Sequence, residues 1–207
     1  MPVICLAGIV FNIALTRYCI NYAGIPLYLD TVFTITVTLS CGLVWGMVCG
    51  ALTNILCHTI FGWGWEPYLF TICNIATAVI TWYFHRTFYS ELAEGSSKYM
   101  QQKSSRLRMA VDRVILLVIF SFILCVAMSI LGGLIATLIL KINSSYVEGY
   151  GISSVLSNTL FGQEVSVLFR EIVSRIPINI IDRLLSVFAG YGFALLLFRW
   201  VKVRVIF

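Results

Sequence analysis

The chain has 207 residues, of which 60% are hydrophobic and 11% are charged, and its mean hydropathy is +0.96. A soluble domain carries about a quarter charged residues, so this composition predicts an integral membrane protein and leaves no room for a soluble catalytic or nucleotide-binding domain. The formal net charge of +5 is explained by cations beside hydrophobic segments, which set the orientation of a membrane protein. We therefore expect a lipid bilayer around the chain and no nucleic-acid partner.

Hydrophobic segments predict a single domain of six transmembrane helices. The expected spans are about 3–22, 29–40, 42–61, 68–88, 111–140 and 178–201, most of them near the ~20 residues that cross the hydrocarbon core. The first span lacks a basic leading region, so we expect it to be retained and not cleaved as a signal peptide. The second is rich in threonine and short for a full crossing, and it either tilts or continues into the third.

Basic residues predict that both termini are cytoplasmic. The polar stretch 90–110 and its flanks hold the densest group of Lys and Arg, which indicates a cytoplasmic loop, and the basic residues from Arg199 onward indicate a cytoplasmic C-terminus. Residues 141–177 then form an external loop. Within it, the apolar spacing from Gln163 to Ile176 predicts an amphipathic helix on the outer surface, which Pro177 is expected to separate from the last span.

A set of polar residues falls in the outer half of this topology. An ionisable residue within a membrane costs about 3 kcal/mol on insertion scales and is a functional-site candidate by default. The set that we predict to form an outer ligand pocket is Asp30, Asn54, Glu66, Asn74, Asn179, Asp182 and Arg183. Trp63 and Trp65 are either stacking walls of this pocket or part of an interfacial belt.

Several of these polar residues also have structural interpretations. Asp30 precedes an apolar run and is expected to cap a helix. Asp182 and Arg183 are adjacent, so their side chains diverge by about 100° on a helix, and we expect each to find its partner on another helix, in the ligand or in water. The cluster is then either a ligand site, suited to a zwitterionic or multiply hydrogen-bonding solute, or a buried ion pair that holds the helices in register.

The sequence shows no recognisable catalytic or metal-binding pattern. The seven cysteines are scattered through apolar stretches without a C-x-x-C pair, which argues against a disulfide framework and a thiolate metal site. No phosphate-binding loop, zinc-protease helix or nucleophile elbow occurs. We therefore expect no enzymatic activity, no cofactor and no metal.

Glycines every four residues mark the third span. Gly42, Gly46 and Gly50 predict close helix packing, either within the monomer or against a partner.

These features resemble the S components of energy-coupling factor transporters. The resemblance rests on PLYLDT (26–31), the threonine-rich helix that follows, G-x-x-x-G-x-x-x-G-A-L-x-N (42–54) and IPINIIDRLLSVFAGY (176–191), and with the six-helix plan it covers nearly the whole chain. It implies a multi-pass protein of the bacterial cytoplasmic membrane that captures a vitamin or similar micronutrient from outside. It further implies docking on a transmembrane coupling subunit driven by two ATPase subunits, and it makes the outer polar set candidates for the ligand pocket or its lid.

The docking surface departs from the family pattern. S components often carry two alanines four residues apart in the first span, whereas here Ala7 and Ala14 are seven apart with Gly8 between them. These three residues, or the glycines of the third span, are the candidates for docking or packing.

Three other functions remain open from sequence alone. The chain is alternatively a membrane sensor that signals through a partner, a lipid-modifying enzyme that depends on Asp30, His58 or Asp182, or an assembly module without transport activity.

Overall fold

The protein is an all-α membrane protein, as predicted. The structure, a computed structural model, describes residues 1–24, 27–62, 64–99, 105–143 and 166–201, and every regular element in these ranges is helical. In chain order they are α1 (Pro2–Arg17), the π-helix η1 (Tyr18–Tyr22), α2 (Val32–Cys41), α3 (Leu43–Phe61), the 3-10 helix η2 (Glu66–Phe70), α4 (Thr71–Tyr99), α5 (Ser105–Ile142) and α7 (Val167–Val201).

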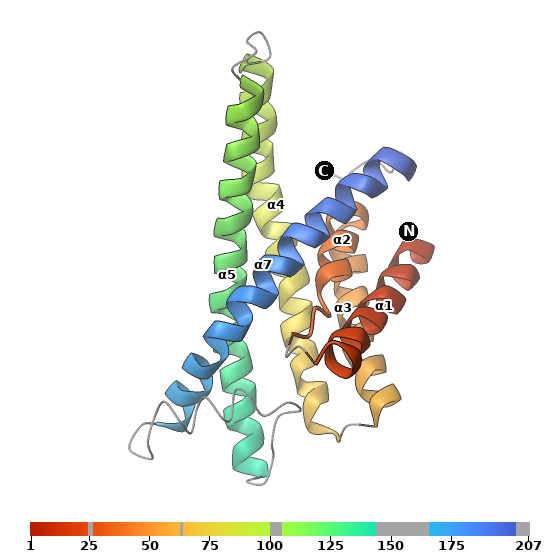
Figure 1. The fold of residues 1–207 in the computed structure, drawn as a ribbon, viewed down its shortest axis with the longest axis vertical. Coiled ribbons are helices and arrows are strands. Elements are labelled where there is room, and N and C mark those ends of the chain that lie inside the picture. Colours follow the sequence, from red (N-terminus) through yellow and green to blue (C-terminus); the bar gives the residue numbers. More distant parts are fainter. Residues whose placement is uncertain (25–26, 63, 100–104, 144–165, 202–207) are drawn as a thin grey trace.

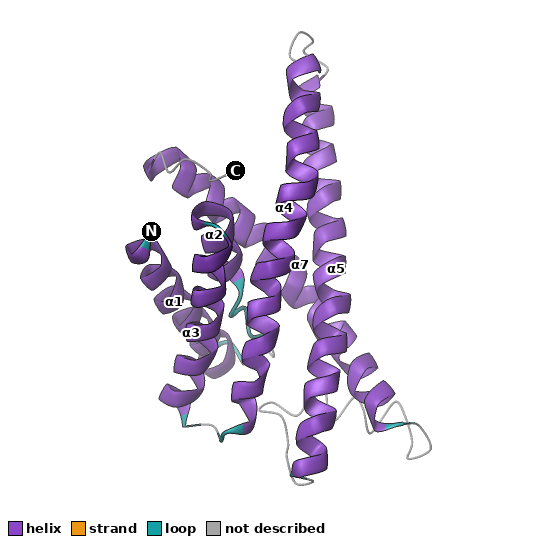
Figure 2. Ribbon diagram, turned by 180° about the vertical axis from the view of Figure 1, so that it is seen from behind, coloured by secondary structure: helices purple, strands orange, loops and turns teal. Residues whose placement is uncertain are grey.

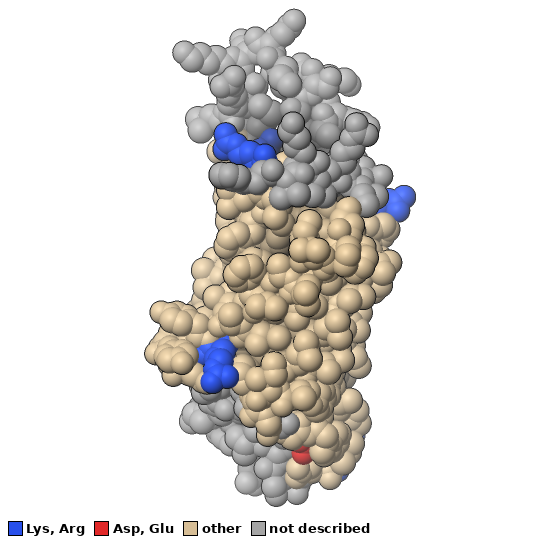
Figure 3. Space-filling view, turned by 90° about the vertical axis from the view of Figure 1, so that its right-hand side faces the viewer, with Lys and Arg blue, Asp and Glu red and all other residues tan. Residues whose placement is uncertain are grey.

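Five helical stretches in the described residues are long and apolar enough to cross a bilayer. They are Pro2–Tyr22, Leu43–Phe61, Glu66–Phe88, Ala110–Ile142 and Val167–Arg199. Figure 3 shows one face of the molecule, where an uncharged surface separates Lys and Arg side chains at two levels. The second predicted span, 29–40, is a helix of only 10 residues, α2, which at 1.5 Å per residue reaches about half of the ~30 Å hydrocarbon core.

The short helix α2 lies at the centre of the bundle, in contact with α1, α3, α4 and α7 (Figures 1 and 2). All of its residues except Phe33 are buried. Its threonines fit an apolar interior because the hydroxyls of Thr36 and Thr38 donate to backbone carbonyls four residues earlier. Ile35 on one side of α2 packs into a core with α5 and α7, and Val37 on the other packs with α1 and α3.

The start of α1 and the end of α7 share one end of the bundle with the end of α4 and the start of α5. Figure 1 shows these four helix ends on the same side. The ends of α1, α3 and α5 and the starts of α4 and α7 lie at the opposite end. This arrangement agrees with the alternation of spans expected from the sequence, in which the first end is cytoplasmic by its basic residues.

The predicted cytoplasmic loop 90–110 is largely helical. α4 continues to Tyr99 and α5 starts at Ser105, while 100–104 lie outside the described residues. The apolar pattern ends where the lipid ends, but a helix can continue into water beyond it. The polar composition therefore marked the edge of the membrane and not the end of the helix.

The expected break at Pro177 does not occur. Pro177 lies inside the continuous helix α7. Proline lacks one backbone donor, but membrane helices tolerate it where neighbouring helices and local adjustments satisfy the freed groups. The prediction of a separate last span from 178 is therefore wrong.

Residues 167–176 also do not form a helix lying on the surface. Within α7, Glu171 and Arg175 are buried at 6% and 9% exposure, whereas Phe169 is 51% exposed. The apolar face points outward and the polar face points into the bundle, which is the arrangement expected of a helix embedded in lipid. The remainder of the predicted external loop, 144–165, lies outside the described residues.

Two of the three ladder glycines pack inside the monomer. A Cβ on Gly46 would lie 2.9 Å from the Thr38 Cβ, and one on Gly50 would lie 2.8 Å from the Asn74 carbonyl oxygen. Gly42 instead forms the turn between α2 and α3 with φ of +89° and open space around it, so it does not pack within the monomer, and packing against a partner stays a prediction.

Of the three candidate docking or packing residues in the first span, one packs inside the monomer and two are exposed. Gly8 packs against Val37 of α2, where a Cβ would lie 2.8 Å from Cγ2. Ala7 and Ala14 are exposed on the outer face of α1. Of the three, only the alanines are therefore placed where a partner helix can reach them.

Candidate functional site

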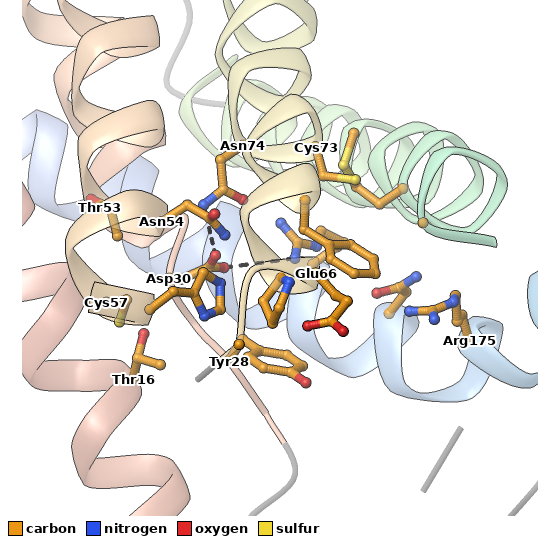
Figure 4. Close-up of a pocket in the computed structure, with 18 of the residues that line it drawn as sticks. Thr16, Tyr28, Asp30, Thr53, Asn54, Cys57, Glu66, Cys73, Asn74 and Arg175 are labelled. Carbon is orange, nitrogen blue, oxygen red and sulfur yellow. Dashed lines mark hydrogen bonds and ion pairs between the residues drawn. The ribbon is translucent and has the colours of Figure 1, made fainter. Parts of the chain in front are cut away.

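A cavity of about 440 Å³ opens at the end of the bundle opposite the start of α1. Figure 4 shows it bounded by α1, the segment before α2, α3, the η2 region and α7. Its size falls within the roughly 300–1,000 Å³ of small-molecule sites. The lining residues are Thr16, Tyr28, Asp30, Thr53, Asn54, Cys57, His58, Gly64, Glu66, Pro67, Phe70, Cys73, Asn74, Met128, Gly132, Asn143, Arg175, Asn179 and Arg183.

Six of the seven residues predicted for the ligand pocket line this one cavity. They are Asp30, Asn54, Glu66, Asn74, Asn179 and Arg183. Asp182 does not line it and is 1% exposed. The polar set that the topology placed in one half of the bilayer is thus brought together, and ligand binding by these residues stays a prediction.

Asp30 faces the cavity from the segment that leads into α2. Its Oδ2 accepts a hydrogen bond of 2.8 Å from the Asn74 side chain on α4 (Figure 4), and its Oδ1 lies 4.0 Å from Nη2 of Arg183. The N-cap of α2 is Thr31, and it makes no side-chain capping bond. The predicted capping role of Asp30 is therefore wrong, since its carboxylate turns toward α4 and α7.

The start of α2 is held by polar groups of other helices. Asn12 of α1, which is fully buried, accepts from the Phe33 backbone N–H at 2.9 Å and donates to Thr34 and Thr53. These bonds satisfy a helix N-terminal donor that has no partner within its own helix. A single amide thus ties α1, α2 and α3 together directly behind the cavity.

Asp182 and Arg183 form an ion pair with each other, and each also contacts another element. Nη2 of Arg183 lies 2.7 Å from Oδ2 of Asp182, so the expectation that adjacent residues cannot pair is wrong. The divergence of about 100° between adjacent residues describes the directions in which the side chains leave the helix. The arginine side chain is long enough to fold back toward Asp182. Nη1 of Arg183 also donates to Thr31, and Oδ1 of Asp182 accepts from the Leu29 backbone N–H.

The backbone at Leu29 is strained. Its φ is +46°, in the left-handed region that costs a residue with a Cβ roughly 1–2 kcal/mol. The hydrogen bond from Leu29 N–H to Asp182, at 2.9 Å, stabilises this conformation. It thereby fixes the positions of the neighbouring cavity residues Tyr28 and Asp30.

Side-chain amides are anchored around the cavity. Asn54 accepts from the Thr71 hydroxyl at 2.7 Å, and Asn179 donates to the Ser129 hydroxyl at 2.9 Å. An amide has both donor and acceptor atoms, so each keeps a further group with which to bind a ligand.

The outer part of the cavity contains a second group of charges. Asn143 donates to Oε1 of Glu66 at 2.9 Å, which links the end of α5 to η2. Nη2 of Arg175 lies 3.6 Å from Oε2 of Glu171, and its guanidinium stacks 5.5 Å from the centre of the Phe70 ring. These groups make the outer wall charged, aromatic and cross-linked between three helices.

The predicted pocket set did not include Arg175, Asn143, Tyr28 or His58, all of which line the cavity. Arg175 was assigned to a surface helix, and nothing in the pattern distinguishes a lipid-facing apolar side from a core-facing one. Asn143 and Tyr28 adjoin predicted helix ends, a position that could have marked them. Trp65 is 51% exposed and does not line the cavity, so it is not a stacking wall, and Trp63 lies outside the described residues.

The described residues contain no cluster of three or more His, Cys, Asp or Glu side chains able to hold a metal ion. The cavity instead offers carboxylates, guanidiniums, amides and aromatic rings. Groups of these kinds can hold an organic solute by hydrogen bonds and charge.

Comparison of the chain with known protein families, curated proteins and solved structures found no match.

Proposed function

We propose that this protein is the substrate-capture subunit of an energy-coupling factor transporter in the bacterial cytoplasmic membrane. It binds a vitamin-like solute from outside and delivers it inward together with a coupling subunit and two ATPase subunits. The observation that carries the proposal is the convergence of six predicted polar residues on one cavity at the predicted outer end of a membrane bundle.

The construction of the cavity supports binding more than structural filling. Buried polar groups are costly in an apolar medium unless they are hydrogen-bonded, and a cavity of about 440 Å³ is far larger than packing alone requires. Asn54, Asn74 and Asn179 are each fixed by hydrogen bonds to neighbours. Fixed donors and acceptors around a preformed space reduce the ordering that a bound solute would require.

The exposed face of α1 supports docking on a membrane partner. Ala7 and Ala14 lie among large exposed apolar residues, including Val3, Leu6 and Val10 at 77%, 63% and 57% exposure. Small residues allow a second helix to approach closely. We assign this face to the coupling subunit.

The test is purification of the full chain from its own membranes in mild detergent, with analysis of both the proteins and the small molecules that accompany it. We expect a discrete small molecule in the wild type, its loss in Arg183→Ala, and recovery of a coupling subunit with ATPases. Absence of any small molecule would overturn the capture function. A kinase or cyclase in place of the ATPases would instead identify a sensor.

A further inference from the structure

We infer that the solute carries a positive charge, and that the carboxylates of Asp30 and Glu66 bind it. This inference rests on the capture function proposed above and specifies its substrate class. It is carried by the way the charges around the cavity are paired.

The two arginines that line the cavity are each paired with an acid that does not line it. Arg183 lies 2.7 Å from Asp182, which is buried behind the wall. Arg175 pairs with Glu171 at 3.6 Å, one helical turn earlier on α7. The positive charges of the lining are therefore largely compensated from behind.

The two carboxylates that line the cavity are held by neutral amides. Asn74 donates to Asp30 at 2.8 Å, and Asn143 donates to Glu66 at 2.9 Å. Glu66 has no ion pair among the described residues, and the guanidinium nearest Asp30 is at 4.0 Å, closer to another acid. An amide fixes the direction of a carboxylate without neutralising its charge.

The formal charges near the cavity therefore have an acidic excess. Four carboxylates (Asp30, Glu66, Glu171 and Asp182) face two guanidiniums (Arg175 and Arg183), which leaves two negative charges uncompensated among the described residues. The other cations at this end of the described chain, Arg17, Lys141 and Arg170, do not line the cavity. In a membrane interior such an excess is unfavourable unless an opposite charge is bound.

The cation that fits is organic and not a metal ion. Asp30 and Glu66 lie on different elements, and no three-ligand cluster exists among the described residues. The cavity holds aromatic and amide groups as well as the acids, and Tyr28 lines it together with Asp30 and Glu66 (Figure 4). An ammonium, amidinium or protonated heteroaromatic group would bind the carboxylates by charge-assisted hydrogen bonds and contact the ring face.

Native mass spectrometry of the full chain in mild detergent tests this directly. We expect the molecule retained by the wild type to be one that is cationic at pH 7. A retained neutral or anionic molecule would overturn the inference while leaving the capture function intact, and no retained molecule would overturn both.

A second measurement assigns the charge preference to the two acids. Benzamidinium and benzamide have almost the same shape and differ in charge, and we expect benzamidinium to displace the retained molecule from the wild type at an at least tenfold lower concentration. Equal potency of the two probes would contradict the inference. Glu66→Gln and Asp30→Asn should each lower retention by roughly ten- to hundredfold, the range of a lost charged hydrogen bond. The control Asp112→Asn, which removes an exposed carboxylate at the far end of α5, should retain the molecule as the wild type does. Equal loss of retention in all three variants would overturn the assignment to Asp30 and Glu66.

Discussion

Replacing Arg183 with alanine should destabilise the protein by leaving Asp182 without its countercharge. Asp182 is 1% exposed, and its polar contacts include Nη2 of Arg183 at 2.7 Å and the Leu29 backbone N–H at 2.9 Å. After Arg183→Ala the neutral backbone donors of the segment before α2 remain, and the countercharge is gone. Removal of one member of a buried pair typically costs 3–5 kcal/mol.

The magnitude has an upper limit, because the stranded carboxylate can take up a proton. Protonating an acid of ordinary pKa near 3.9 at pH 7 costs about 4 kcal/mol. The cost of burying the unpaired carboxylate charge cannot exceed that value. A buried acid that stays protonated in the fold is stabilised at low pH and loses that stability as pH rises above the unfolded pKa. The loss of unfolding free energy in Arg183→Ala should therefore decrease by about 1.4 kcal/mol for each unit by which the pH is lowered below 7, to roughly 1.5 kcal/mol at pH 5.

Unfolding with SDS in mixed micelles, followed at pH 5 and pH 7, measures both quantities. Asp182→Asn combined with Arg183→Ala should recover about 2 kcal/mol at pH 7, because the amide still accepts from Leu29 without a charge. Arg17→Ala, which removes an exposed arginine stacked 5.5 Å from Phe61, is the control and should cost no more than about 1 kcal/mol. A loss that is independent of pH, or one that the asparagine fails to relieve, would refute the electrostatic reasoning.

Further substitutions test the packing of the bundle and its partner surface. Gly46→Val should lower the free energy of unfolding by about 1–3 kcal/mol through overpacking against Thr38, and adding Thr38→Ala should restore part of that loss. Unfolding of Gly46→Val at the wild-type SDS concentration would contradict the contact. Asn12→Ala should cost about 1–3 kcal/mol, because it leaves the Phe33 N–H unsatisfied, while the exposed Val10→Ala should have little effect; equal losses would argue against the amide network. Ala14→Trp, on the outer face of α1, should leave solute retention unchanged while lowering recovery of the proposed coupling subunit, and full recovery would exclude this face as the docking surface.

Convergence of the polar residues was predictable because two weak rules agree. The positive-inside rule gives the direction of each span, and hydropathy gives its approximate ends. Together they placed Asn54, Asn74 and Asn179 at similar depth although they lie on three different helices. The structure adds the lateral packing that turns equal depth into a shared cavity.

The errors arose where a local rule met tertiary packing. Pro177 is a helix breaker in isolation, but in α7 it lies within a packed helix. The adjacency of Asp182 and Arg183 predicts diverging side chains, but arginine is long enough to fold back. Both rules describe only the local backbone or the direction of the Cβ. The observed helix continuity and ion pair depended on packing by other helices and on the length of the side chain.

Arg175 illustrates a limit specific to membrane proteins. An amphipathic helix in water hides its apolar side, whereas one in lipid exposes it. The pattern from Val167 to Ile176 is the same in both cases, so it could not tell which side faced the interior. The buried ion pair with Glu171 follows from the second arrangement.

The ten-residue length of α2 has an electrical consequence. If water fills the cavity down to Asp30 at the foot of α2, the membrane voltage falls mainly across the ~15 Å of this helix instead of the ~30 Å of the hydrocarbon core, and the local field is about doubled. A monovalent cation that passes from Asp30 to the cytoplasmic end would then move through nearly the whole voltage, worth about 2.3 kcal/mol per 100 mV. In the proposed transporter, an inside-negative membrane would pull such a solute inward, and its release into the cell would depend on voltage as well as on the proposed ATPase subunits.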